Sequence, residues 1–151
     1  MKIEEIIKSN SVISNEKRTV LNIMFTQNIV ADAFNEILRT FDLSVEQFNV
    51  LRILRGQKGK PANMCVIQER MIAKTSNTTR LVDKLLLKGL VNRVVCEQNR
   101  RKMEITITER GLQFLNELDP KIEAHELLFA NNLTKQELEN LNELLEKYRT
   151  I

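Results

Sequence analysis

Residues 62–111 read ANMCVIQERMIAKTSNTTRLVDKLLLKGLVNRVVCEQNRRKMEITITERG, and this stretch decides the fold. Its first part has apolar residues at helical spacing and predicts a short helix over 63–71. A second helix should begin at Thr75 or Ser76, where a hydroxyl can cap its first N–H groups, and should end before Gly89. Only residues 72–74 lie between the two helices, which is the spacing of a helix-turn-helix.

The pattern changes from helical to alternating after Gly89. Residues 90–97 predict one strand, 97–102 a charged turn and 103–108 a second strand, because apolar and polar side chains alternate in both segments. A hairpin with a basic turn that directly follows a helix-turn-helix is a wing. These residues therefore predict a winged helix-turn-helix.

Long helices should flank this winged unit. Residues 16–40 and 109–131 have helical patterns, and Ser44 with Gln47 forms a capping-box signature before a helix that should stop at Gly56. A final helix over 135–148 follows a second capping box and carries an apolar stripe. The expected fold is mainly α with a small β-wing. We expect residues 1–151 to form a single domain, with a DNA-binding lobe at 42–108 and helical dimerisation regions at 1–40 and 109–151.

Charge is concentrated in the same central segment. Residues 52–102 hold thirteen Lys or Arg and three acidic residues, a net charge of +10, whereas the rest of the chain carries −7, which together give +3. A basic lobe of this kind is typical of a protein that binds a polyanion. Double-stranded DNA is the partner that a winged helix-turn-helix favours.

A helical wheel separates the two faces of the second helix. Thr78, Leu81, Val82 and Leu85 fall on the core side, and short hydroxyls and cations fall on or near the other side. Such side chains reach base edges and phosphates in a major groove. The residues predicted to contact DNA from this helix and its turn are Lys74, Thr75, Ser76, Asn77, Thr79, Arg80 and Lys84.

The wing should supply a second set of DNA contacts. Arg100, Arg101 and Lys102 are three consecutive cations at the predicted hairpin turn. A narrow minor groove concentrates negative potential and attracts inserted arginine. The other interpretation is a turn whose charge merely prevents edge-to-edge strand pairing.

The sequence contains, in order, the run TRLVDKL, the run KGLV, an arginine, a basic wing and a strand that ends I-T-x-x-G at Gly111. Together these motifs resemble the core of the multiple-antibiotic-resistance regulator (MarR) family. The resemblance covers about 45–115. It implies a homodimer built from the first and last helices and a reading helix at 75–88. It also implies regulation by a small aromatic or amphipathic effector. The family's wing usually has Asp, one residue, then Arg, whereas Asn99 precedes Arg101 here.

Other functions have less support. The chain has one histidine, His125, and lacks the H-E-x-x-H, G-x-S-x-G and P-loop motifs, so we expect neither an enzyme nor a bound cofactor or metal. Two alternatives stay open. Cys65, near the start of the helix over 63–71, could make the regulator redox-responsive, or the winged helix could be a protein-interaction module. The apolar runs are too short for a bilayer, so we expect a cytoplasmic protein without a membrane partner.

Overall fold

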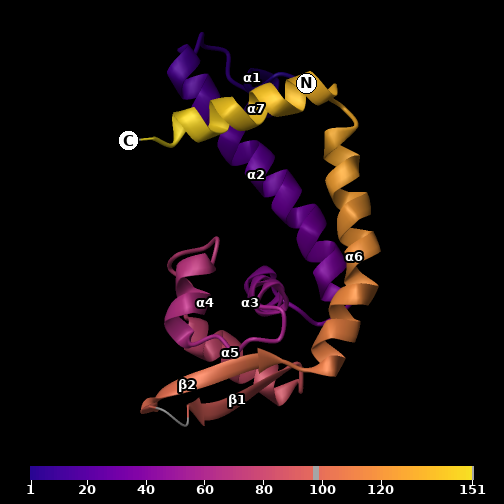
Figure 1. Cartoon of the computed structure of the whole chain (residues 1–151). Coiled ribbons are helices and arrows are strands. Elements are labelled where there is room, and N and C mark those ends of the chain that lie inside the picture. Colours follow the sequence, from indigo (N-terminus) through magenta and orange to yellow (C-terminus); the bar gives the residue numbers. More distant parts are fainter. Residues whose placement is uncertain (97–98, 151) are drawn as a thin grey trace.

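The computed structural model describes residues 1–96 and 99–150, without the side chains of Arg100 and Arg101. It is mostly helical, with one two-stranded antiparallel sheet. Both chain termini lie at the end of the molecule away from the sheet (Figure 1). The elements in chain order are α1 (Ile3–Ile6), α2 (Asn15–Arg39), α3 (Val45–Gly56), α4 (Met64–Arg70), α5 (Thr78–Leu87), β1 (Val91–Cys96), β2 (Asn99–Ile107), α6 (Glu109–Ala130) and α7 (Lys135–Tyr148).

The winged lobe, defined as α3, α4, α5, β1 and β2, surrounds one hydrophobic core. Leu51 of α3, Ile67 of α4 and Leu85 of α5 are fully buried together with Ile105 of β2. Leu118 of α6 and other residues of α2 and α6 complete the same core. The fold is therefore mainly α with a β-wing, as the sequence predicts, and the core fixes how α5 lies against the rest of the lobe.

The wing is longer on its second strand than the sequence predicts. The strands pair from Val91 with Ile107 to Val95 with Met103, and the register then shifts so that Cys96 pairs with Asn99. Asn99–Lys102 thus belong to β2, and their prediction as a turn is wrong. The register shift between Val95 and Cys96 accommodates the additional residues of β2. The sequence does not predict this part of the strand, because its residues are all polar and show no alternation with apolar ones.

The reading helix begins later than the sequence predicts. Its first helical residue is Thr78, and its N-cap is Asn77 instead of Thr75 or Ser76. The segment between α4 and α5 therefore spans residues 71–77, not 72–74 alone. Thr75, Ser76 and Asn77 all have side chains that can cap a helix, so the sequence alone does not show which one does. In the folded turn the cap is Asn77.

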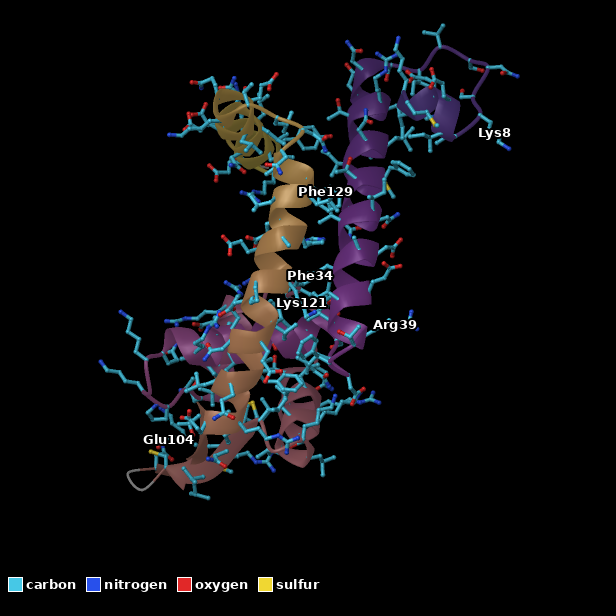
Figure 2. The ribbon with its side chains drawn as sticks, turned by 90° about the vertical axis from the view of Figure 1, so that its right-hand side faces the viewer. Lys8, Phe34, Arg39, Glu104, Lys121 and Phe129 are labelled. Carbon is cyan, nitrogen blue, oxygen red and sulfur yellow. The ribbon has the colours of Figure 1, made fainter. Side chains whose placement is uncertain are left out.

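Two long helices, α2 and α6, extend from the winged lobe and separate toward the other end of the molecule (Figure 1). Arg55 at the end of α3 holds Asp119 of α6 through two hydrogen bonds of 2.7 and 3.0 Å, which join the lobe to α6. Farther along, His125 is buried and lies 3.2 Å from the carbonyl oxygen of Val30. Phe34 and Phe129, whose rings lie about 5 Å from the His125 ring, are seen between the two helices in Figure 2.

The helix α7 has no buried residue. Its capping box is present as predicted, with Thr134 and Glu137 each accepting a hydrogen bond from the other's backbone N–H. Figure 2 shows α7 and α2 as separate helices at the far end. The apolar side chains that α7 leaves exposed are Leu141, Leu144, Leu145 and Tyr148. The described chain thus presents an amphipathic helix that buries none of its side chains.

Candidate nucleic-acid interface

The outer face of α5 carries the side chains that the sequence assigns to DNA. Thr78, Val82 and Leu85 are buried, whereas Thr79, Arg80 and Lys84 are exposed. Within the described residues, neither Arg80 nor Lys84 takes part in an ion pair. The division between the two faces is confirmed, and the two cations are accessible to a bound anion.

Asn77 has a structural task at the start of α5. Its side-chain oxygen accepts a hydrogen bond from the backbone N–H of Arg80 at 3.1 Å. Bidentate recognition of adenine requires both the oxygen and the nitrogen of an asparagine amide. The amide nitrogen of Asn77 and the second lone pair of its oxygen stay available, so Asn77 can pair with adenine only in orientations that keep or replace the cap bond.

An open groove lies between α4 and the start of α5. It runs beside the predicted reading residues, and its rim includes both charged and hydroxyl side chains. Lys74 and Ser76–Thr79 line one side, and Met64, Cys65, Gln68 and Glu69 line the other. Lys74 and Thr75 are exposed, and Ser76 is half-buried. The structure thus brings the predicted residues of the turn and of α5 to one edge of the lobe.

Lys74 is also engaged within the protein. Its ammonium donates a hydrogen bond of 2.5 Å to the carbonyl oxygen of Glu69, in the last turn of α4. A cation at that position interacts favourably with the C-terminal end of the helix dipole. Lys74 is exposed, yet its side chain helps to hold the turn against α4.

Ion pairs fix α5 to its neighbours at two further points. Nη1 of Arg93 in β1 lies 2.5 Å from Oδ1 of Asp83 in α5, and this ion pair joins α5 to the wing. Lys88, at the end of α5, lies 3.0 Å from the carboxylate of Asp42. Both pairs are partly exposed, so they orient the elements more than they stabilise the fold.

The wing residues are only partly within the described structure. Lys102 is exposed on β2. The backbones of Arg100 and Arg101 belong to the same strand, but their side chains lie outside the described residues, so the predicted minor-groove contact stays a prediction.

The two cysteines are separate, free thiols. Cys65 is exposed at the second position of α4 and lines the groove, and Cys96 is half-buried at the end of β1. The redox response proposed for Cys65 stays a prediction.

Sequence reasoning missed two polar residues. Gln68 contacts both the turn and α5, and His125 of α6 is buried against α2. No local sequence pattern identifies either contact, because the partners of His125 come from a distant helix and those of Gln68 depend on the fold of the turn.

Neither residue belongs to a group of three metal-binding side chains, and the part of the chain that the structure covers contains no such group. The described helices also include none with the length and apolar character needed to cross a membrane.

Comparisons with known proteins agree on one family. The model of the MarR family matches residues 43–103. The transcriptional repressor IacR of Pseudomonas putida is 30% identical over 125 residues, which cover 81% of this chain and 69% of that protein. A MarR transcription factor structure from Planctomyces limnophilus is 29% identical, with a TM-score of 0.70 over 90% of this chain and 98% of that one. The structure of BpsR from Bordetella bronchiseptica superimposes with a TM-score of 0.80 at 18% identity, over 93% and 99% of the two chains.

Proposed function

Because the chain belongs to the MarR family of transcription regulators, we propose that it is a repressor that binds a pseudo-palindromic DNA operator as a homodimer. The exposed face of α5, with Thr79, Arg80 and Lys84, is the observation that carries this proposal. An arginine can bond guanine in the major groove, and a lysine can neutralise a phosphate. The net charge of +10 over residues 52–102 supports the same partner.

The proposed DNA-binding lobe comprises residues 42–108, and the proposed dimerisation region comprises 1–40 and 109–151. Support for the dimer comes from apolar side chains that one copy leaves exposed. Met24 in α2 is 58% exposed and Leu144 in α7 is 64% exposed. The helix α7 and the first part of α2 lie at the end of the molecule away from the sheet (Figure 1). A second copy supplies a matching surface, since a two-fold interface pairs the same patch on both subunits.

The wing is proposed to contribute contacts to the minor groove beside the reading helix. Lys102 is exposed, and Arg100 and Arg101 precede it on the same strand. Inserted arginines favour narrow, A·T-rich grooves. The wing would then prefer particular flanking sequences, whereas α5 reads the central bases of each half-site.

A small effector is proposed to control DNA binding. In BpsR of Bordetella bronchiseptica, whose fold this chain shares, DNA binding is regulated by 6-hydroxynicotinic acid. In this chain, the rings of Phe34, His125 and Phe129 lie close together between α2 and α6, and Phe34 also packs against Phe48 of the lobe. A small aromatic or amphipathic ligand between the dimer helices and the lobe suits that composition.

Selection of bound sequences from a random duplex pool with the purified protein tests the proposal. We expect enrichment of a pseudo-palindrome whose half-site centres lie roughly 34 Å, or one helical turn, apart. Affinity for the enriched duplex should fall steeply with salt concentration, since bound cations release counterions from the phosphates.

The same experiment separates the proposal from a protein-interaction module. A module of that kind would enrich no sequence and would show no salt-dependent affinity for random duplex. Either a failure to enrich a sequence or an asymmetric site without a repeated half would contradict the proposed homodimeric operator binding.

A further inference from the structure

Gln68 lies at the middle of the contact between the two helices of the helix-turn-helix. It belongs to the last turns of α4, is half-buried and lines the groove beside the start of α5. Neither its charge nor its position in the sequence marks it as a DNA ligand. Its side chain instead contacts the two segments that carry the proposed reading residues.

Both ends of the Gln68 amide are bonded. The nitrogen Nε2 donates to the carbonyl oxygen of Lys74 in the turn at 2.7 Å. The oxygen Oε1 accepts a hydrogen bond from the hydroxyl of Thr78, the first residue of α5. One side chain therefore joins α4 to the turn and to the reading helix at once.

A third hydrogen bond runs from the turn to α4. The Lys74 ammonium donates to the carbonyl oxygen of Glu69, the residue next to Gln68, at 2.5 Å. Lys74 is thus bonded to α4 twice, because its backbone oxygen accepts from Gln68 and its ammonium donates to the carbonyl oxygen of Glu69. We name Gln68, Lys74 and Thr78 the turn clamp.

Apolar packing holds the start of this turn through the buried Met71, but it does not hold residues 72–75. Ile72 is 79% exposed, and Ala73, Lys74 and Thr75 are exposed as well. The buried Val82 and Leu85 anchor the middle and the end of α5, and its first turn has the buried Thr78 and the half-buried Leu81 on the core side. Between Met71 and Thr78 the chain is therefore joined to α4 mainly by polar contacts, and these help to set where the N-terminal end of α5 lies relative to the lobe.

We propose that Gln68 is a positioning residue for DNA recognition, which sets the placement of the first turn of α5 through its bonds to Lys74 and Thr78. This inference rests on the proposed function. Base contacts require accurate placement of the reading side chains, whereas contacts with phosphates tolerate small shifts. Loss of the clamp should therefore reduce discrimination between sequences more than affinity for DNA in general.

The test compares the wild type with Gln68→Leu, which keeps a similar size without hydrogen-bonding groups, on the selected operator and on random duplex. We expect operator affinity to fall on the order of tenfold, because two hydrogen bonds are lost, with random-duplex affinity and the salt slope unchanged. Thr78→Val should give part of the same loss, and Thr78→Ser, which keeps the hydroxyl, should restore operator affinity. Gln57→Leu is the matched control, because it makes the same substitution at a half-buried glutamine of the lobe whose Nε2 has no hydrogen-bond partner among the described residues and which does not line the groove.

Thermal unfolding and amide hydrogen exchange complete the experiment. Exchange in residues 72–77 should accelerate in Gln68→Leu and not in Gln57→Leu, while the circular dichroism spectrum stays that of the wild type. A purely structural role would instead lower the active fraction on both duplexes equally. If Gln68→Leu does not fold, Thr78→Val supplies the same comparison.

The outcomes are distinguishable. A wild type that binds all duplexes equally overturns the proposed function, and the inference with it. A wild type that discriminates, together with a Gln68→Leu protein that keeps the same ratio of affinities, overturns the inference alone. Equal amide exchange rates in residues 72–77 of the wild type and of Gln68→Leu also overturn the inference.

Discussion

At the scale of single residues, Arg80 and Lys84 allow base reading to be separated from phosphate binding. Arg80→Ala should weaken operator binding by about 1–3 kcal/mol and relax the preference at one base pair. Lys84→Ala should weaken binding to every duplex and lower the salt slope by about one unit. Titrations of both variants against operator and random duplex, at several salt concentrations, measure the difference. Equal losses on both duplexes for Arg80→Ala would mean that Arg80 contacts phosphate.

Which side chains face outward on α5 could be predicted from the sequence, because the periodicity of a helix depends only on residue spacing. Thr78, Val82 and Leu85 are buried as the wheel requires. The cap could not be predicted, since Thr75, Ser76 and Asn77 all carry suitable oxygens. The bonds of Gln68 were also beyond prediction, because they exist only once the turn has its folded shape.

At the scale of elements, the junction between the wing and α6 depends on Gly111. A Cβ atom at this position would lie 2.3 Å from the carbonyl oxygen of Leu90 and 2.7 Å from Cγ1 of Ile107. Gly111→Ala should therefore destabilise the protein by about 1–3 kcal/mol or more, since the neighbouring backbone has to move. Chemical denaturation measures the change in the free energy of unfolding.

Gly56 provides the matched control for that substitution. It is the last residue of α3, and a Cβ atom there would meet no heavy atom within 4 Å. Gly56→Ala should be neutral or should stabilise the protein by about 0.4–1 kcal/mol, because alanine restricts the unfolded chain. A Gly111→Ala protein as stable as Gly56→Ala would contradict the close packing of the wing against α6.

The helices and the wing were more predictable than the limits of the strands. Alternation from Met103 to Ile107 is strong because one face of β2 packs on the core, as the buried Ile105 shows. Asn99–Lys102 lack that alternation, so the sequence placed them in a turn. Local patterns also predicted both capping boxes correctly, since these involve residues only three positions apart.

At the scale of the whole molecule, the exposed stripe of α7 predicts the effect of a single charge. Leu144→Glu places a carboxylate on the stripe and should convert the proposed dimer to a monomer at micromolar concentration, because an unpaired buried charge is costly. Light scattering gives the mass in solution. Gln136→Glu, which adds the same charge to another exposed position of α7, is the control and should leave the mass unchanged. A wild type with the mass of a monomer would contradict the proposed assembly.

Sequence reasoning identified the flanking helices but not how they meet. The bond between Arg55 and Asp119 and the burial of His125 against α2 join residues 64 and 95 positions apart. Their residue types alone would suit a solvent-exposed helix equally well. Contacts of this range require the tertiary fold, which is why the candidate reading helix was predictable and its coupling to the long helices was not.

The absence of buried residues in α7 has a consequence for how the protein responds to its own abundance. A helix of fourteen residues without packing partners is marginal in water. If the second copy covers it, subunit association and the ordering of α7 are one equilibrium. The melting temperature should then rise with protein concentration, as mass action requires. Dilution would separate the subunits and unfold α7 at the same time. The fraction of operator sites occupied by the dimer would then change more than in proportion to the protein concentration in the cell.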